Sequence, residues 1–255
     1  MDTRCPSDFK LSTASTWTSG VQVVIILVMR KDPLVIGQYY HVYNRGTDKR
    51  VIFMDKFDLW RFLQSMEEFN TLDPIGSIYE NRFNKNQLGH PVSKLVDIVC
   101  YSLNPNHYHF ILSPLVENGI EKFMHKLGMG YAKYFNEKYD RTGVLFQGRY
   151  KSIHIGTDEY LMYLSAYINL NNKIHFLSHP DSKIDKEKLF YTSSWKEYIG
   201  EKKTNFCNKS IILDRFDGKI KEYEEFAESV AEGIIERRID DNFGLRSDLM
   251  IEEIF

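Results

Sequence analysis

The alternation of apolar and polar residues predicts a run of short strands and amphipathic helices between residues 38 and 171. Strands are expected at 38–44, 95–103, 107–112 and 150–155, where β-branched and aromatic residues are concentrated. Helices are expected at 56–69, 119–139 and 158–171, where apolar residues recur at helical spacing. Thr157 is a candidate N-cap for the last of these helices.

The order of these elements predicts the fold class. Strand, helix, strand, strand, helix, strand is the split β-α-β pattern of ferredoxin-like folds. We therefore expect an α+β protein with an antiparallel sheet, helices on one face, and a mostly helical C-terminal extension. Residues 70–93 are rich in Asn, Gly and Pro and predict an irregular connection.

The N-terminal part of the chain differs from the rest. The apolar stretch 21–29 is too short to span a bilayer, and no small-residue cleavage site follows it. We expect residues 1–28 to be a non-native or disordered extension, residues 29–175 to form the functional domain, and residues 176–255 to form a helical extension with an acidic tail. No association with a membrane is expected.

Composition is ordinary for a globular protein, with 43% hydrophobic and 27% charged residues. The net charge of −2 is low for a protein that binds nucleic acid, but the acidity is concentrated at one end. Residues 222–255 hold 11 acidic and 3 basic side chains, a net charge of −8, which leaves +6 for the remaining chain. A nucleic-acid partner is therefore compatible with the charge distribution.

The cysteines indicate the redox environment. Cys5, Cys100 and Cys207 are odd in number, widely spaced and form no CxxC pattern. A disulfide framework and a thiolate metal site are therefore not expected, and a reducing, cytoplasmic location fits.

His107 and His109 are the first candidate for chemistry. They stand two residues apart on a predicted strand, so both imidazoles should project from the same face. Two convergent imidazoles are suited to a divalent metal, although a third ligand must come from elsewhere. The alternative is a pair of polar residues on a solvated strand face.

A tyrosine nucleophile for a phosphodiester would need to lie close to such a metal. One economical arrangement places the tyrosine and the third metal ligand one helical turn apart. Among the tyrosines of the two later helices, Tyr167 alone has a metal-competent side chain, Asn171, at i+4. The alternative is that Tyr160, Tyr163 and Tyr167 form a partly buried aromatic stripe.

Four segments of the chain resemble motifs of the REP-associated tyrosine transposases, a branch of the single-tyrosine HUH transposases. Residues 40–46 resemble the opening strand of that family, and 104–109 its His-hydrophobic-His motif. Residues 146–152 resemble its Gln-Gly-Arg-aromatic-Lys-Ser strand, and 167–171 the start of its tyrosine helix. Order and spacing match from about Met29 to Asn172, which would make 29–175 an HUH single-tyrosine transposase domain.

The resemblance implies a DNA transposase that cleaves and rejoins single-stranded or hairpin DNA. Tyr167 would be the nucleophile that forms a 5′-phosphotyrosine, and Mg²⁺ or Mn²⁺ would be held by His107, His109 and Asn171. One departure is that the family usually has Pro after the Asn, where this chain has Asn172. Candidate phosphate contacts are Arg45, Lys133, Arg149 and Lys151.

Other functions are compatible with the same residues. A single-stranded nucleic-acid-binding module without catalysis would use a similar sheet with exposed aromatics. A replication-initiator or relaxase-like nickase would share the chemistry, and an inactive, domesticated relative would share only the fold. His41 is expected to be structural or a DNA contact rather than a metal ligand, and the protein is expected to be a monomer or a homodimer.

Overall fold

The computed structural model describes residues 9–18, 21–30, 33–73, 75–76, 78, 93–178, 190–204 and 206–242. The chain divides into two compact units, 1–35 and 36–255. In the first unit, β1 (Phe9–Thr18) and β2 (Val21–Arg30) pair as an antiparallel two-stranded sheet. The expectation that 1–28 is an extension of the functional chain stays a prediction, and residues 1–8 and 19–20 lie outside the described part.

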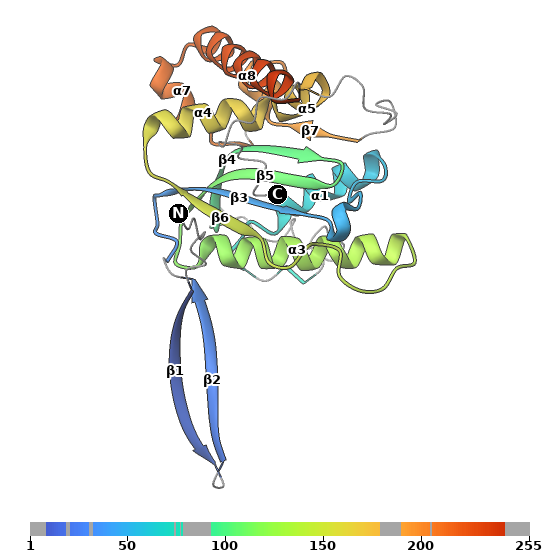
Figure 1. The fold of residues 1–255 in the computed structure, drawn as a ribbon, viewed down its shortest axis with the longest axis vertical. Helices are drawn as coiled ribbons and strands as arrows, with labels where there is room; N and C mark the ends of the chain where they lie inside the picture. Colours follow the sequence, from blue (N-terminus) through green and yellow to red (C-terminus); the bar gives the residue numbers. More distant parts are fainter. Residues whose placement is uncertain are drawn as a thin grey trace. The chain divides into compact units, whose positions relative to one another are not determined.

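The second unit is built on a five-stranded sheet (Figure 1). Its strands are β3 (Tyr39–Arg45), β4 (Val96–Asn104), β5 (His107–Pro114), β6 (Lys151–Ile155) and β7 (Thr192–Ser193). The strands lie in the order β6-β3-β5-β4-β7, and all neighbours are antiparallel. The strands β3, β4, β5 and β6 have the arrangement of a ferredoxin-like split β-α-β sheet. The predicted α+β fold class is therefore confirmed.

Two helices cover one face of the sheet, as the ferredoxin-like pattern requires. They are α1 (Lys56–Glu68) and α3 (Gly119–Lys138). Phe62 of α1 packs edge-on against Tyr131 of α3, with ring centroids 4.8 Å apart, and it also contacts Tyr108 of β5. Tyr108 therefore points into this core, which leaves the neighbouring residues of β5, His107 and His109, on the opposite face.

The opposite face is covered by α4 (Asp158–Asn169) and α5 (Asn171–Ser178). The Oγ1 of Thr157 accepts a hydrogen bond from the backbone N–H of Tyr160, so the predicted N-cap is confirmed. The single helix predicted at 158–171 is instead two helices, because Leu170 leaves the helical conformation between them (φ −102°, ψ 11°). Helices thus lie on both sides of the sheet rather than on one, because a further helical pair follows the ferredoxin-like unit.

The C-terminal part is mostly helical, as expected. Short helices α6 (Trp195–Tyr198) and α7 (Ser210–Leu213) precede α8 (Ile220–Asn242), which packs against α4 and α5 (Figure 1). The helix α5 continues across residue 175, and β7 pairs with β4, so these residues contribute to the main unit. The boundary at residue 175 stays a prediction, and the end of the acidic tail, 243–255, lies outside the described residues.

Candidate active site

The strand β5 places His107 and His109 side by side. Their ring centroids are 5.0 Å apart and the rings are perpendicular. The alternation of side chains along the strand produces this arrangement, because Tyr108 between them turns into the core beside Phe62. The face that carries the two imidazoles is the one covered by α4, where ring contact joins His109 to Tyr167.

A third histidine, His41 of β3, forms a hydrogen bond with His109. Its Nε2 lies 3.0 Å from Nδ1 of His109, and the two rings are stacked with centroids 5.3 Å apart. Both side chains are buried, with 0% of His41 and 1% of His109 exposed. Sequence reasoning had left His41 as a structural residue or a DNA contact, and its contact with His109 depends on a strand pairing that the residue pattern does not specify.

Burial controls the protonation of these imidazoles. Loss of solvation lowers the pKa of His107 to about 3, with smaller contributions from His175 and Arg45. The same cause lowers the pKa of His41 to about 3 and that of His109 well below its ordinary value. The three rings are therefore neutral near pH 7, which is the form in which imidazole binds a metal.

The predicted nucleophile, Tyr167, lies on α4 and faces the histidine pair. Its ring is edge-on to that of His109, with centroids 6.0 Å apart. Only 2% of Tyr167 is exposed, so the side chains around it must move before a phosphodiester can reach its hydroxyl. The structure therefore brings Tyr167 and the histidines together, in a closed arrangement.

Asn171, the predicted third metal ligand, is fully buried at the start of α5. Its Oδ1 accepts a hydrogen bond of 2.8 Å from Nδ2 of Asn104, the residue paired with His107 across the β4–β5 ladder. Its Nδ2 is buried and has no hydrogen-bond partner. If both carboxamide groups are rotated by 180°, Nδ2 of Asn171 donates to Oδ1 of Asn104 and the hydrogen bond is kept. Oδ1 of Asn171 then takes the place of the unpaired Nδ2, and an oxygen atom there has lone pairs that a metal ion can use.

His175 is a residue of this site that sequence reasoning missed. It lies on α5, four residues after Asn171, and its ring centroid is 5.6 Å from that of His107. Extending the i, i+4 spacing by one more turn, from Asn171 to His175, would have found it. It was not found because the helix was expected to end at residue 171.

The residue chemistry fits a divalent cation. Two neutral imidazoles and a buried carboxamide are ligands that such ions accept in proteins. Within the described residues, no three His, Cys, Asp or Glu side chains are placed to hold a metal ion. A site on this face therefore depends on Asn171 as the third protein ligand.

The four candidate phosphate contacts are distributed over two faces. Arg45 pairs with His107 in the β3–β5 ladder and donates from Nε to Gln147, and Lys151 pairs with Tyr43 in the β3–β6 ladder. Arg149, just before β6, is exposed. Lys133 is exposed on α3, across the sheet from the histidines, and makes an ion pair of 3.8 Å with Glu137. The structure thus brings Arg45 and Lys151 to the histidine face and does not bring Lys133 there.

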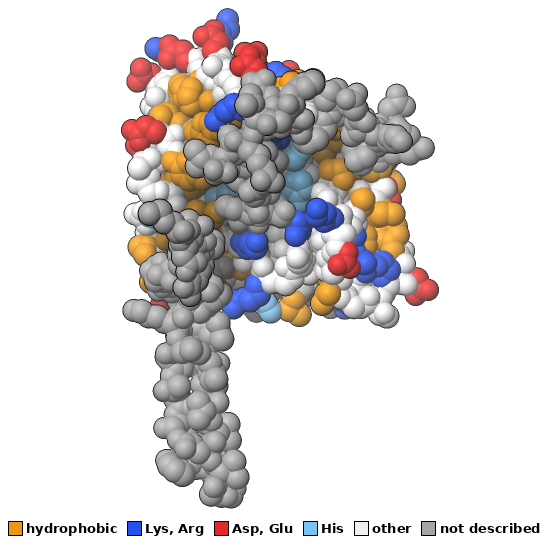
Figure 2. All heavy atoms as spheres, viewed as in Figure 1, with side chains coloured by type: hydrophobic (Ala, Val, Ile, Leu, Met, Phe, Trp, Pro, Cys, Tyr) orange, Lys and Arg blue, Asp and Glu red, His pale blue; other side chains and the backbone are white. Residues whose placement is uncertain are grey.

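Figure 2 shows one face of the molecule. His side chains lie near the middle of this view with Lys and Arg side chains beside them, and Asp and Glu lie mainly along its upper edge, with a few at the right. Positive charge close to the imidazoles is the environment that a phosphate backbone requires.

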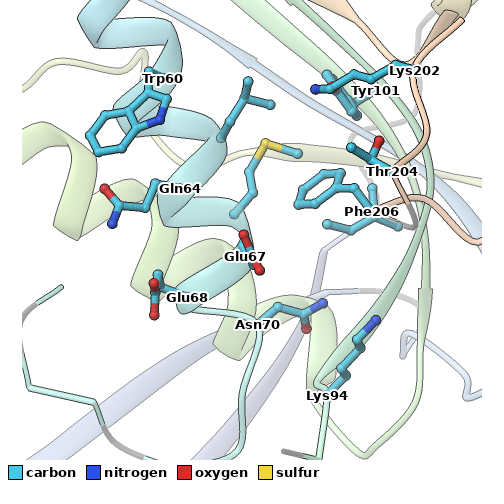
Figure 3. A pocket seen from close by; sticks show the side chains of 13 residues that line it. Trp60, Gln64, Glu67, Glu68, Asn70, Lys94, Tyr101, Lys202, Thr204 and Phe206 are labelled. Atoms are coloured by element: carbon cyan, nitrogen blue, oxygen red, sulfur yellow. The ribbon is translucent and has the colours of Figure 1, made fainter. Parts of the chain in front are cut away.

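A separate cavity of about 660 Å³ lies on the other side of the sheet (Figure 3). Trp60 and Gln64 of α1 face Thr204 and Phe206 across it. Tyr101 of β4 also lines it, and Tyr101 pairs with Phe110 on the face that packs against α1 and α3. The cavity is therefore not part of the histidine site.

The remaining features bear on the compartment. Cys100 and Cys207 are buried and free, whereas Cys5 lies outside the described residues. No helix within the described part of the chain is long and apolar enough to cross a membrane.

The candidate site thus has a histidine pair on β5, the central strand of a ferredoxin-like sheet. Helix α4, which carries Tyr167, packs over this pair. Residues 87–171 match the family model described as IS200-like transposase. Over that stretch, about one third of the chain, the protein is similar to the IS200-like transposases, and the match includes His107, His109, Tyr167 and Asn171. The resemblance seen in the sequence motifs is thereby confirmed at the level of this family model.

The chain also resembles solved structures. A solved structure of the REP-associated tyrosine transposase bound to a REP hairpin is similar over 58% of this chain and 74% of that chain, at 12% identity and a TM-score of 0.37. Because this TM-score is low, the fold class is assigned from the strand order of the sheet and not from this likeness. No curated protein matches the sequence.

Proposed function

We propose that the protein is a metal-dependent DNA transposase that cleaves and rejoins single-stranded hairpin DNA. The observation that carries the proposal is the packing of Tyr167 against His109, on the sheet face that also holds His107 and Asn171. An aromatic stripe alone would account for a buried Tyr167, but not for neutral imidazoles and a carboxamide gathered beside it.

The roles of the side chains follow from their positions. His107, His109 and Asn171 would hold Mg²⁺ or Mn²⁺, which when bound would polarise a non-bridging oxygen of the scissile phosphate. The hydroxyl oxygen of Tyr167 attacks phosphorus and loses its proton, the bond from phosphorus to the 3′ oxygen breaks, and the leaving oxygen takes up a proton. The 5′-phosphotyrosine keeps the phosphodiester energy, so a 3′-hydroxyl can reverse the attack and join strands.

Positively charged side chains would position the DNA. Arg45 and Lys151 lie on the histidine face, and Arg149 is exposed two residues before Lys151, so we assign the phosphate contacts to these three. Lys133, a fourth candidate from the sequence, lies across the sheet and is expected to contribute little. The protein would act in the cytoplasm as a monomer or a homodimer.

Covalent trapping tests the proposal. Labelled hairpin DNA is incubated with the protein and Mg²⁺, and a denaturing gel detects a protein–DNA adduct. We expect an adduct with the wild type and with Tyr163→Phe, a change on the same helix, and none with Tyr167→Phe or without metal. An adduct formed equally by Tyr167→Phe contradicts the nucleophile assignment, and DNA binding without any adduct or metal dependence favours a binding module.

A further inference from the structure

The hydrogen bond between His41 and His109 has no role in the function proposed above. It joins the two central strands β3 and β5, in a place where neither side chain is accessible to solvent. Stacking of the two rings, whose planes differ by 16°, restricts their rotation further. The orientation of His109 is therefore set by His41 as well as by its own strand.

This contact involves Nδ1, one of the two ring nitrogens of His109. A neutral imidazole has one N–H group and one lone pair. His41 occupies Nδ1 of His109, so a metal ion held by His109 would have to be bound by Nε2. Metal-binding histidines generally donate their second ring N–H to a neighbouring group, which fixes both the tautomer and the direction of the ring.

We propose that His41 is a positioning residue of the metal site: it accepts the Nδ1–H of His109 and presents the Nε2 lone pair of His109 to the divalent cation. The inference rests on the proposed function, because it requires His109 to be a ligand. It assigns to β3 a part in a site otherwise built from β5, α4 and α5.

The other nitrogen of His41 predicts how the contact responds to the metal. Nδ1 of His41 is buried and has no hydrogen-bond partner. When His41 accepts from His109, its own proton must lie on this unpartnered nitrogen, and a buried N–H without an acceptor is unfavourable. In the metal-free protein we therefore expect the reverse arrangement, in which Nε2–H of His41 donates to Nδ1 of His109.

Binding of Mn²⁺, followed by the electron paramagnetic resonance signal of the free ion, tests the proposal. His41→Phe keeps a ring in the stack but removes the acceptor, and we expect its Mn²⁺ affinity to fall by about 10- to 100-fold. His41→Gln can restore a polar atom near the position of Nε2, so it should recover most of the affinity. His154→Phe is the matched control, because His154 hydrogen bonds to Gln38 and pairs with Tyr40 on the opposite face.

The outcomes separate this proposal from the proposed function. Tight binding by both the wild type and His41→Phe overturns the role of His41 and leaves the metal site intact. A wild type that binds no Mn²⁺ contradicts the metal site itself, and the role of His41 with it. Thermal unfolding of each variant establishes that the fold is retained.

A second measurement decides the question if His41→Phe does not fold. Nitrogen-15 spectra of the wild-type imidazoles report which ring nitrogen carries the proton. With saturating Mg²⁺ we expect the proton of His109 on Nδ1, and after Mg²⁺ removal we expect it on Nε2. A proton on Nε2 of His109 in the Mg²⁺-bound protein overturns the proposal.

Discussion

At the scale of single residues, the candidate site contains two hydrogen bonds between side chains that are distant in the sequence, His41 with His109 and Asn104 with Asn171. The spacing of His107 and His109 predicted two imidazoles on one face, and the structure places their rings 5.0 Å apart. The sequence could not show that His41 contacts His109, because that contact depends on the register between β3 and β5. It also could not show the contact between Asn104 and Asn171, which lie 67 residues apart.

The Asn104–Asn171 hydrogen bond predicts a stability change. Asn104→Leu removes the donor to the buried Oδ1 of Asn171, and a buried polar group left without its partner costs about 1–3 kcal/mol. Urea unfolding at pH 7 measures the loss. Asn136→Ala is the control, because Asn136 bonds at the surface and should change the unfolding free energy by less than about 1 kcal/mol. Equal stability of Asn104→Leu and the wild type would show that this contact does not hold Asn171.

At the scale of elements, helix α1 is held to α3 by a charged cluster. Asp55 caps α1 and forms a capping box with Asp58. Lys138 of α3 lies 2.7 Å from both carboxylates, and Asp58 is fully buried. Burial of Asp55 opposes its ionisation, but hydrogen bonds from Lys138 and from the helix backbone outweigh that effect and lower its pKa. Lys138 has a raised pKa, so both groups are charged at neutral pH.

Lys138→Met should therefore destabilise the fold in a pH-dependent way. It leaves the Asp58 carboxylate buried without its cation, which costs about 3 kcal/mol at pH 7. The lowered pKa of Asp55 contributes stability above its unfolded value, about 4, and this contribution is lost as pH falls through the folded value. The difference in the free energy of unfolding between Lys138→Met and the wild type, measured with urea, should thus become smaller below about pH 4.

Lys133→Met on the same helix is the matched control for this change. Its ion pair with Glu137 is exposed, and such pairs contribute less than about 1 kcal/mol. A Lys138→Met protein no less stable than Lys133→Met at pH 7 would contradict the role given to the cluster.

Helix α4, which carries Tyr167, is joined to α8 by the buried hydroxyl group of Tyr223. The Tyr223 hydroxyl accepts a hydrogen bond of 2.8 Å from Nδ2 of Asn169 and lies 3.2 Å from Oγ of Ser165. Both residues are on α4. Tyr223→Phe should cost about 2 kcal/mol in the free energy of unfolding, since it leaves these polar groups without that partner. Tyr191→Phe, at an exposed position, should cost almost nothing, and comparable losses in both variants would refute the anchoring.

At the scale of the whole molecule, the order of the elements was predictable because each strand and helix has a clear residue period. The sheet order follows from that sequence of elements, but the layer formed by α4, α5 and α8 does not. Residues 176–255 were expected to form a helical extension, and among the described residues of that range β7 joins the sheet and α8 packs against α4 and α5. Contacts between distant helices depend on side-chain fit, which the period of a single helix does not encode.

The distribution of charge over the molecule predicts how DNA binding depends on salt. Each phosphate that a side chain contacts makes the slope of log affinity against log salt concentration steeper by about 0.7 for single-stranded DNA. Arg45→Gln should therefore make that slope shallower by about 0.7, because Arg45 lies beside His107 in the sheet. Lys133→Gln should leave the slope unchanged. A similar change of slope in Lys133→Gln would contradict the proposal that DNA binds on the histidine face.

The central claim is that Tyr167 attacks DNA, and its most direct test is to identify the residue that carries the adduct. Protein trapped on hairpin DNA with Mg²⁺ is digested with nuclease and protease, and mass spectrometry locates the remaining phosphonucleotide. We expect the modification on Tyr167 and on no other tyrosine of the same peptide. A nucleotide attached to Tyr160 or Tyr163, or the absence of any adduct with cleaved DNA present, would contradict it.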